Sequence, residues 1–212
     1  MSPSHGVDDH DGRLQGVAVG IVSNNEDPEG MGRVKLRFPW RGVDDESDWA
    51  RIAVPMAGDD MGTYFLPERG DEVLVAFDDG DIRYPYVIGA LWNGEHDPPA
   101  ANDGDNDVRK IRSRSGHEVV FDDGEGEESV EVTSQGGHQI SLSDEAGSET
   151  VTIEDSSGAN VIEFDPTAGS LSIESGATIS LEAPQIEIEG DGNVSIEAGG
   201  MLTLKGAVIK LN

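Results

Sequence analysis

The sequence predicts an all-β protein in which a small N-terminal barrel is followed by a repetitive β-rod. Two patterns carry this prediction. Short segments of alternating apolar residues fill the first half, and regularly spaced apolar pairs separated by glycine-rich turns fill the second. The composition agrees, because a hydrophobic fraction of 35% with 28 glycines favours thin, turn-rich β structure over a thick helical core.

The barrel is expected within residues 15–97, after a polar and acidic segment at residues 1–14 that we interpret as a flexible arm. No stretch of the barrel region shows helical periodicity. Alternating apolar residues predict five short strands, at residues 17–21, 34–38, 52–54, 72–77 and 84–91. That is the strand number of a small Greek-key barrel such as the OB-fold.

The rod is expected at residues 111–212, after a linker at residues 98–110 that is rich in Pro, Gly, Asn and Asp. Its apolar pairs share one pattern, in which two apolar residues flank a single residue. The pairs are Val119/Phe121, Val130/Val132, Ile140/Leu142, Val151/Ile153, Ile162/Phe164, Leu171/Ile173, Ile179/Leu181, Ile186/Ile188, Val194/Ile196, Leu202/Leu204 and Ile209/Leu211. The step between successive pairs shortens along the chain, as a comparison of Val119 to Val130 with Ile179 to Ile186 shows.

These pairs predict that the rod forms only in an assembly. A step of seven or eight residues supplies one strand, whereas a monomeric β-solenoid coil needs roughly twenty residues or more to enclose a core. A single chain would make a thin sheet with one apolar face, which is prone to aggregate. Three chains around a common axis remove this problem, because each contributes one strand per step to a triangular prism. We therefore expect an obligate homotrimer of eleven strands per chain.

The charge of the chain excludes several classes of partner. Its formal net charge is −29 at pH 7, with 43 acidic residues against 14 Lys and Arg. Phosphate backbones repel such a surface, so nucleic acid is not an expected partner, and an anionic membrane surface is disfavoured in the same way. Acid excess with only four lysines is typical of a halophilic protein, because concentrated salt screens self-repulsion. A very soluble surface is the alternative interpretation.

Four stretches of the barrel region resemble a known family. They read GMGRVKLRFPW at residues 30–40, WARIAVPMAG at 49–58, FLPERGDEVLVAF at 65–77 and PYVIGALWNG at 85–94. These stretches are similar to the OB-fold domain of phage baseplate spike proteins and of the VgrG spikes of type VI secretion. The following repeats look like the triple-stranded β-helix of the same family.

The resemblance implies a structural function. Such a protein is the central spike of a contractile injection machine, which pierces the target envelope when the sheath contracts and links a hub to a tip protein. Some phage spikes carry a lysozyme domain between barrel and β-helix, but residues 98–110 leave no room for one. Only a short arm precedes the barrel, so the hub is expected to be a separate baseplate protein. We expect no enzymatic activity.

The C-terminal end is the candidate site for a tip partner. Lys205 and Lys210 are the only lysine or arginine residues after Arg114. Lys205 precedes the last apolar pair, Ile209 and Leu211, and Lys210 stands between its two members. The resemblance implies a PAAR-type protein docked on this end, with Lys205, Ile209, Lys210, Leu211 and Asn212 in contact. The alternative is that the lysines only protect an exposed strand edge against aggregation.

Other candidate chemistry is weak. His117 and His138 occupy equivalent positions in successive repeats, which explains them without a metal ion. Asp103, Asp105 and Asp107 resemble the start of a calcium loop, but the glycine stands at the second position instead of the sixth. No nucleophile or carboxylate pair has a diagnostic spacing. We expect no catalytic residues, metal or cofactor.

One alternative function stays open, a secreted or surface carbohydrate-binding β-solenoid. Such a protein would show ladders of aromatic residues on the rod, and the rod contains only Phe121 and Phe164. The first residues have neither the basic nor the apolar segment of a signal peptide. We therefore expect synthesis in the cytoplasm, and the resemblance implies assembly inside the tail tube or baseplate of a virion or extracellular injection particle.

Overall fold

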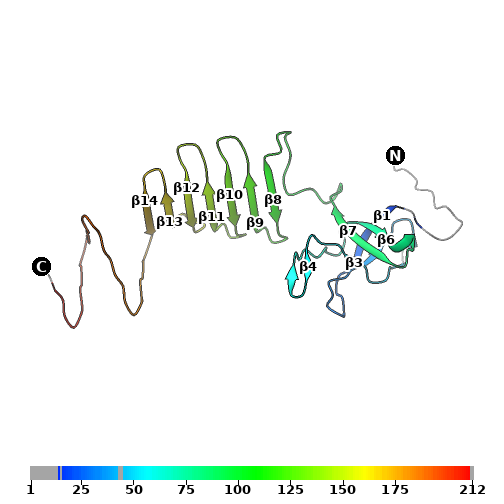
Figure 1. The fold of residues 1–212 in the computed structure, drawn as a ribbon, viewed down its shortest axis with the longest axis horizontal. Helices are drawn as coiled ribbons and strands as arrows, with labels where there is room; N and C mark the ends of the chain where they lie inside the picture. The colour runs from blue at the N-terminus through cyan, green and yellow to red at the C-terminus, as the bar shows by residue number, and fades with distance from the viewer. Residues whose placement is uncertain (1–13, 15, 43–44, 211–212) are drawn as a thin grey trace. The chain divides into compact units, whose positions relative to one another are not determined.

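A computed structural model describes residue 14 and residues 16–42 and 45–210. The chain forms two compact units, one up to Asp103 and one from Gly104 onward. Both consist of β-strands, and one 3-10 turn, η1 (Asp78–Gly80), is the helical structure of the described residues (Figure 1). Within the described ranges, no helix is long and apolar enough to cross a membrane.

The first unit is a closed five-stranded barrel. Its sheet has the order β2-β1-β6-β7-β3, and isolated bridges from Val34 to Ala50 and from Arg37 to Glu46 join β2 to the segment that leads into β3. A separate hairpin, β4–β5, follows β3 in the chain (Figure 1). The strands are β1 (Val17–Asn24), β2 (Lys35–Arg37), β3 (Arg51–Ile52), β4 (Ala57–Gly58), β5 (Met61–Gly62), β6 (Glu72–Phe77) and β7 (Pro85–Leu91).

The barrel core follows from strand alternation. On β6, Val73, Val75 and Phe77 point inward and are buried, while the residues between them are partly exposed. They pack with Val22, Val34, Leu36, Phe38, Ala50 and Val87 in one cluster. Burying each large apolar side chain contributes about 1.5–3 kcal/mol, so this cluster supplies the main stabilisation of the barrel.

All five predicted barrel strands are present, with small differences at their ends. The predicted arm differs at its last residue, because Leu14 packs against the barrel core and its backbone N–H donates to Gly80 O at 2.8 Å. A main-chain bond plus apolar burial fixes Leu14 to the barrel. Residues 1–13, the rest of the predicted arm, lie outside the described residues.

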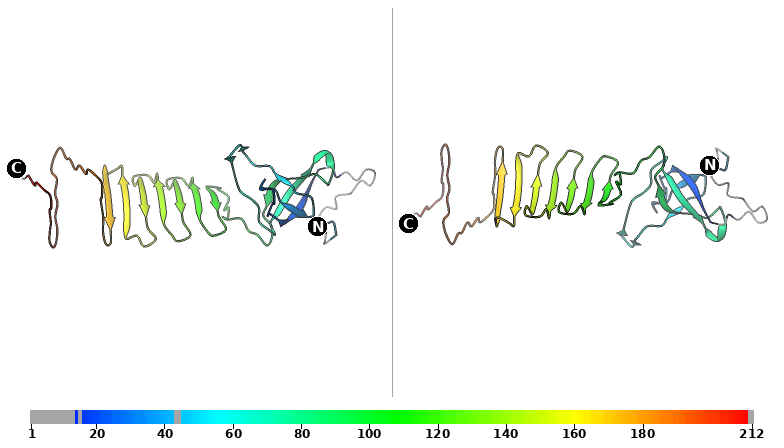
Figure 2. Two further views of the ribbon diagram at one scale, coloured as in Figure 1. Left: turned by 90° about the horizontal axis from the view of Figure 1, so that it is seen from below. Right: turned by 90° about the horizontal axis from the view of Figure 1, so that it is seen from above.

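The second unit is a seven-stranded antiparallel meander in which each strand pairs with its neighbours in sequence (Figure 2). Tight turns connect the strands. At Gly137 the backbone has φ +84° and a Cβ would lie 3.2 Å from Ser156 Cβ, so this turn requires glycine. The strands are β8 (Val108–Arg112), β9 (Glu118–Asp122), β10 (Ser129–Thr133), β11 (Gln139–Ser143), β12 (Thr150–Glu154), β13 (Asn160–Asp165) and β14 (Ser170–Ser175).

The register of the meander places the apolar pairs directly opposite one another. Phe121 faces Val130, and Ile140 faces Ile153, for example. Two continuous columns result on one face of the sheet. The first contains Phe121, Val130, Leu142, Val151, Phe164 and Leu171, and the second contains Ile111, Val119, Val132, Ile140, Ile153, Ile162 and Ile173.

The structure differs from the predicted rod in two respects. Strand β8 begins at Val108, inside the predicted linker, because Ile111 pairs with Val119 and extends the sheet by one strand. Residues 176–210 form no strand within the described chain, and they run in long stretches beyond β14 (Figures 1 and 2). The longer steps before Leu171 leave room for a strand and a turn back onto the same chain. The shorter steps after Leu171 do not.

Candidate functional site

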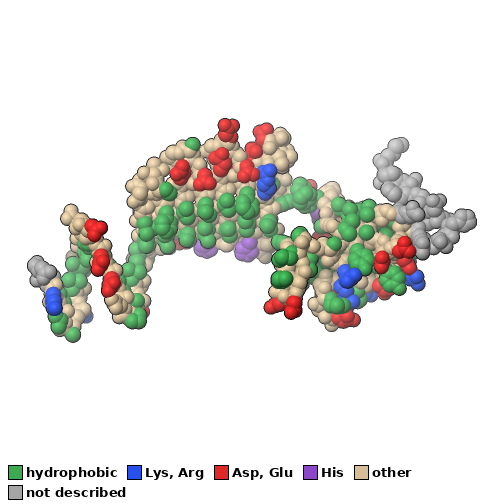
Figure 3. Space-filling view, viewed as in Figure 1, with side chains coloured by type: hydrophobic (Ala, Val, Ile, Leu, Met, Phe, Trp, Pro, Cys, Tyr) green, Lys and Arg blue, Asp and Glu red, His purple; other side chains and the backbone are tan. Residues whose placement is uncertain are grey.

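The candidate functional site is the apolar face of the sheet β8–β14. Its side chains are only half covered: Phe121, Leu142 and Ile153 are each 44% exposed, and Leu171 is 56% exposed, whereas Leu36 in the barrel core is fully buried. Figure 3 shows these apolar side chains as parallel rows along the sheet. Monomeric proteins rarely expose a continuous apolar surface of this extent, so the face is an interface.

The opposite face of the same sheet is mainly polar, with Val120 and Val161 among its few apolar residues. Its strands present Ser, Thr, Glu and Gln residues, such as Glu131, Ser141 and Thr152. At its beginning, Lys110 Nζ and Arg112 Nη1 lie 2.8 and 2.9 Å from the Glu118 carboxylate. The hydrogen bond from Lys110 lowers the pKa of Glu118. This face is suited to solvent, while the apolar face is not.

The segment after β14 also exposes apolar pairs, although it forms no sheet. All residues of the segment 176–210 are exposed, including Ile179 at 53%, Leu181 at 71% and Ile188 at 69%. Unpaired backbone groups and uncovered apolar pairs both require a partner strand. Because the described chain supplies none, other copies of the chain are the natural source.

The predicted tip residues lie at the end of this segment. Lys205, Ile209 and Lys210 are exposed, with Ile209 at 50%. Leu211 and Asn212 lie outside the described residues. The two lysines of this end are far in sequence from all other cationic residues, because no lysine or arginine occurs between Arg114 and Lys205.

His117 and His138 occupy equivalent turns, as their sequence positions predicted. His117 Nδ1 accepts a hydrogen bond from the backbone N–H of Gln135 at 3.1 Å, and His138 Nδ1 accepts one from Ser156 at 3.3 Å. Each imidazole therefore joins its own turn to the next turn on the same side of the sheet. Among the described residues, no three His, Asp or Glu side chains lie close enough to hold a metal ion.

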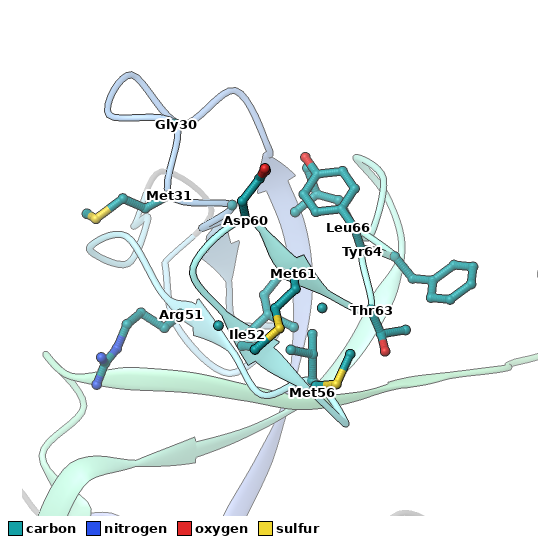
Figure 4. A pocket seen from close by; sticks show the side chains of 16 residues that line it. Gly30, Met31, Arg51, Ile52, Met56, Asp60, Met61, Thr63, Tyr64 and Leu66 are labelled. Carbon is teal, nitrogen blue, oxygen red and sulfur yellow. The ribbon is translucent and has the colours of Figure 1, made fainter.

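The barrel carries a second exposed apolar surface, which the sequence analysis did not predict. A groove of about 680 Å³ lies beside the hairpin β4–β5 (Figure 4). Its lining includes Met31, Met56, Met61, Tyr64 and Phe65, whose exposed fractions range from 53% to 78%. In the sequence, the feature that could have indicated this surface is a glycine-containing loop with four large apolar residues, Met56, Met61, Tyr64 and Phe65, that do not alternate as in a strand.

One rim of this groove is cross-linked by hydrogen bonds to Asp27. Arg33 Nε and Nη2 donate to the two carboxylate oxygens of Asp27 at 2.9 and 2.7 Å, and the backbone N–H groups of Glu29 and Met31 also donate to Asp27. The hydrogen bond from the Arg33 guanidinium is the main cause that holds the pKa of Asp27 well below its usual range, and the backbone hydrogen bonds lower it further. The backbone of Met31 is therefore positioned at the groove by its hydrogen bond to Asp27.

Comparison with known proteins identifies both units. Residues 18–92 match the family described as the type VI secretion system/phage-baseplate injector OB domain, and residues 129–212 match the phage baseplate V C-terminal trimerisation domain. The two matches together cover most of the chain. The protein belongs to the VgrG-like baseplate spike family.

Several relatives of this VgrG-like spike are type VI secretion proteins. The chain is 37% identical to the spike protein VgrG2a of Pseudomonas aeruginosa over 95 residues, which are 43% of this chain and 11% of the relative. It is 33% identical to VgrG4b of the same species over 114 residues, 49% of this chain and 14% of the relative. Each match thus spans only a small part of the relative's length.

A third relative carries a further activity in its name. The actin cross-linking toxin VgrG1 of Vibrio cholerae is 28% identical over 134 residues, which are 59% of this chain and 12% of the toxin. The matched families support a structural spike and give no support to the carbohydrate-binding alternative. They also confirm the predicted OB-fold barrel, and the trimerisation domain supports the predicted homotrimer.

Proposed function

We propose that three copies of this VgrG-like spike form a non-enzymatic piercing device, which sheath contraction drives through a target envelope. One observation carries the proposal. Strands β9–β14, of which β10–β14 lie in the matched trimerisation domain, expose a continuous apolar face, and the opposite face is mainly polar. Three such sheets with their apolar faces inward make a closed prism with a hydrophilic exterior.

The physical properties of the prism fit a mechanical role. Every apolar pair lies on the axis, so burial stabilises the rod along its whole length. Backbone pairing in the three sheets resists bending, and winding of the 176–210 segments of three chains around one another covers the sheet edge at β14. The exterior, rich in Ser, Thr, Asp and Glu, offers no adhesive patch to an envelope during passage.

The barrel is the proposed attachment to the baseplate hub. Its support is the groove beside β4–β5, where Met56, Met61, Tyr64 and Phe65 are exposed. Methionine and aromatic side chains are enriched at the centres of protein interfaces. A hub surface with protruding apolar side chains fits this groove.

The C-terminal end is the proposed seat of a PAAR-type tip protein. Lys205 and Lys210 introduce cations after a long shaft without any, and Ile209 is half exposed between them. In a trimer these residues recur three times around the axis and give an apolar centre with a basic rim. Such a surface suits a small protein with an apolar, acidic base.

We further propose where the spike acts. The chain is made in the cytoplasm and assembled in the tail tube or baseplate of a virion or extracellular injection particle, and it touches the target envelope only transiently. The net charge of −29 supports folding in concentrated salt.

The decisive experiment measures assembly. Light scattering of the purified chain in concentrated salt should give three times the chain mass of 22.5 kDa. Cryo-electron microscopy of the particles should place this trimer on the axis of the baseplate. A folded monomer in solution, or a position on the outside of the particle, would refute the proposed function.

A further inference from the structure

The two edges of the sheet β8–β14 differ in charge. Turns 123–128, 144–149 and 166–169 all lie on one edge, which we call the acidic edge. Turns 113–117, 134–138 and 155–159 lie on the other, which we call the histidine edge. In Figure 3 acidic side chains gather toward the upper edge of the sheet and the histidines lie along the lower edge.

The charges on both edges are graded along the rod in a complementary way. The turns of the acidic edge carry first Asp123, Glu125, Glu127 and Glu128, then Asp144, Glu145 and Glu149, and finally no charge. The turns of the histidine edge carry first Arg114 and His117, then His138, and finally Asp155. The most acidic turn and the most basic turn therefore belong to the same end of the sheet.

Three-fold symmetry determines which edges meet. When three identical sheets turn their apolar faces to one axis, each corner of the prism joins the left edge of one copy to the right edge of the next. An acidic edge can then meet only a histidine edge. Two acidic edges never face each other in such a trimer, although each carries a strong excess of negative charge.

The turns on the two edges also alternate in height. Turn 134–138 follows β10, whereas turns 123–128 and 144–149 precede β10 and follow β11. Successive strands are about 4.8 Å apart, so each turn of one edge is level with the space between two turns of the other. At a corner, the turns of neighbouring copies can interdigitate instead of colliding.

His117 and His138 each have a ring nitrogen free of intrachain backbone bonds that can donate to a neighbouring chain. Because Nδ1 of His117 and of His138 accepts a backbone N–H within its own chain, the proton of the neutral imidazole belongs on Nε2. The Nε2–H is then a donor for an external acceptor. Both histidines are exposed, and carboxylates are the acceptors that the acidic edge supplies.

We propose that the corners of the trimer are specific contacts between copies, in which His138 of one chain lies between turns 123–128 and 144–149 of the next. Arg114 and His117 lie against turn 123–128 of the same neighbour. Apolar burial is not directional and does not choose among alignments of the three sheets. The graded corner charges choose one alignment, because sliding a chain by one hairpin moves Asp155 from beside one acidic turn, 144–149, to a place between two, 123–128 and 144–149. The inference rests on the homotrimer of the proposed function.

A disulfide experiment tests the corner directly. The chain contains no cysteine, so an introduced pair has no competitor. We combine Gln135→Cys on the histidine edge with Glu127→Cys on the acidic edge. Within one chain, five-residue strands separate these edges by about 17 Å, far more than the 7 Å or so between Cα atoms that a disulfide spans. The matched control combines Gln135→Cys with Ser115→Cys, both on the histidine edge.

We expect the oxidised E127C/Q135C protein to run as a covalent trimer on a denaturing gel, and the control pair to give no covalent trimer. If light scattering shows a trimer and E127C/Q135C still runs as single chains, the corner contact is refuted while the proposed spike survives. If the unmodified protein is a monomer, both proposals fail.

Charge reversal tests the role of the contact. His138→Glu places a carboxylate among those of the neighbouring chain, and we expect about a tenfold increase in trimer dissociation on dilution. His138→Gln, which removes the imidazole without adding charge, should have a smaller effect. Adding Glu127→Lys to His138→Glu should restore the trimer. Equal dissociation of H138E and H138Q would contradict an electrostatic contact at this corner.

Discussion

Ile140 and Ile153 face each other directly across strands β11 and β12, and both stay more than 40% exposed in the isolated chain. A cross-strand apolar pair stabilises a sheet, yet here half of each side chain still faces outward. The same relationship recurs at the other rungs of the sheet. One chain therefore forms the whole apolar face, and burial of this face requires a second surface packed against it.

Ile153→Asp tests this face. In the trimer three carboxylates would meet near the axis without partners, and each unpaired buried charge costs several kcal/mol. We expect loss of the trimer, measured as chain mass by light scattering. The matched control is Thr152→Asp, because Thr152 is the adjacent residue on the polar face of the same strand. Trimer loss in the Thr152 variant alone would show that the faces are reversed.

The sequence predicted this face better than it predicted the pairing of its strands. Pairs such as Val130/Val132 and Ile162/Phe164 show period-two alternation, and this fixes which side chains share a face. Periodicity does not reveal whether the neighbouring strand comes from the same chain or another. The length of the step does, since the longer steps allow the meander β8–β14 and the shorter ones leave residues 176–210 without an internal partner.

The groove of the barrel was beyond prediction for a different reason. Strands β4 and β5 have two residues each, too few to show alternation, and Met56 and Met61 are brought together by the hairpin between them. From the sequence alone, apolar residues in such a loop are most simply interpreted as part of the buried core. Only the fold shows that Met61 is 63% exposed.

Met61→Glu tests the proposed hub contact. Met61 lines the groove and packs against no buried core residue of the barrel cluster, so the variant should keep its fold and its trimer. A carboxylate in an apolar interface without a partner weakens binding by a factor of about 10 or more. The measurement is recovery of the spike in assembled baseplates. The control is Asp59→Asn in the same hairpin loop, and full incorporation of M61E would contradict the hub assignment.

The Asp27–Arg33 pair predicts acid sensitivity of the barrel. The pKa of Asp27 lies below its unfolded value of about 4, so the ionised carboxylate stabilises the fold fully above that pH. This contribution is lost as the pH falls below about 4. We expect Asp27→Asn to lower the melting temperature at neutral pH and to flatten its decrease in acid.

Tryptophan fluorescence can follow this transition, because the Arg33 guanidinium lies 5.8 Å from the centre of the Trp49 ring. The matched control is Glu29→Gln. Glu29 also pairs with Arg33, at 3.3 Å, but its side chain is 66% exposed, and exposed ion pairs contribute little. If the two variants melt alike at every pH, the Asp27 network does not stabilise the loop.

Salt should stabilise the assembly. A trimer carries three times the net charge of −29, and its few cations cannot compensate. At about 3 M salt the screening length falls to a few Å or less, compared with about 8 Å at physiological ionic strength, so repulsion between acidic turns is largely removed. We expect the melting temperature to rise steadily in a potassium chloride series. A flat response would remove the halophilic interpretation and leave the fold unaffected.

Truncation after Ala207 tests the C-terminal site. It removes Ile209 and Lys210 but leaves the apolar face of β8–β14, so the trimer should keep its mass and nearly all of its melting temperature. A docking surface with an apolar centre and basic rim would be lost, and with it the tip protein, measured by its co-purification with the spike. A second variant, Lys205→Glu with Lys210→Glu, keeps the chain length and reverses only the rim.

The two variants separate docking from simple protection of the end. If the end only prevents aggregation, exposing the shortened end should cause the truncated trimers to associate end to end, while co-purification of the tip protein stays unchanged. If it is a docking site, both variants lose the tip protein and penetration, and the charge-reversed spike does so without aggregating. Retention of the tip protein by both variants would refute the assignment of Lys205, Ile209 and Lys210 to this contact.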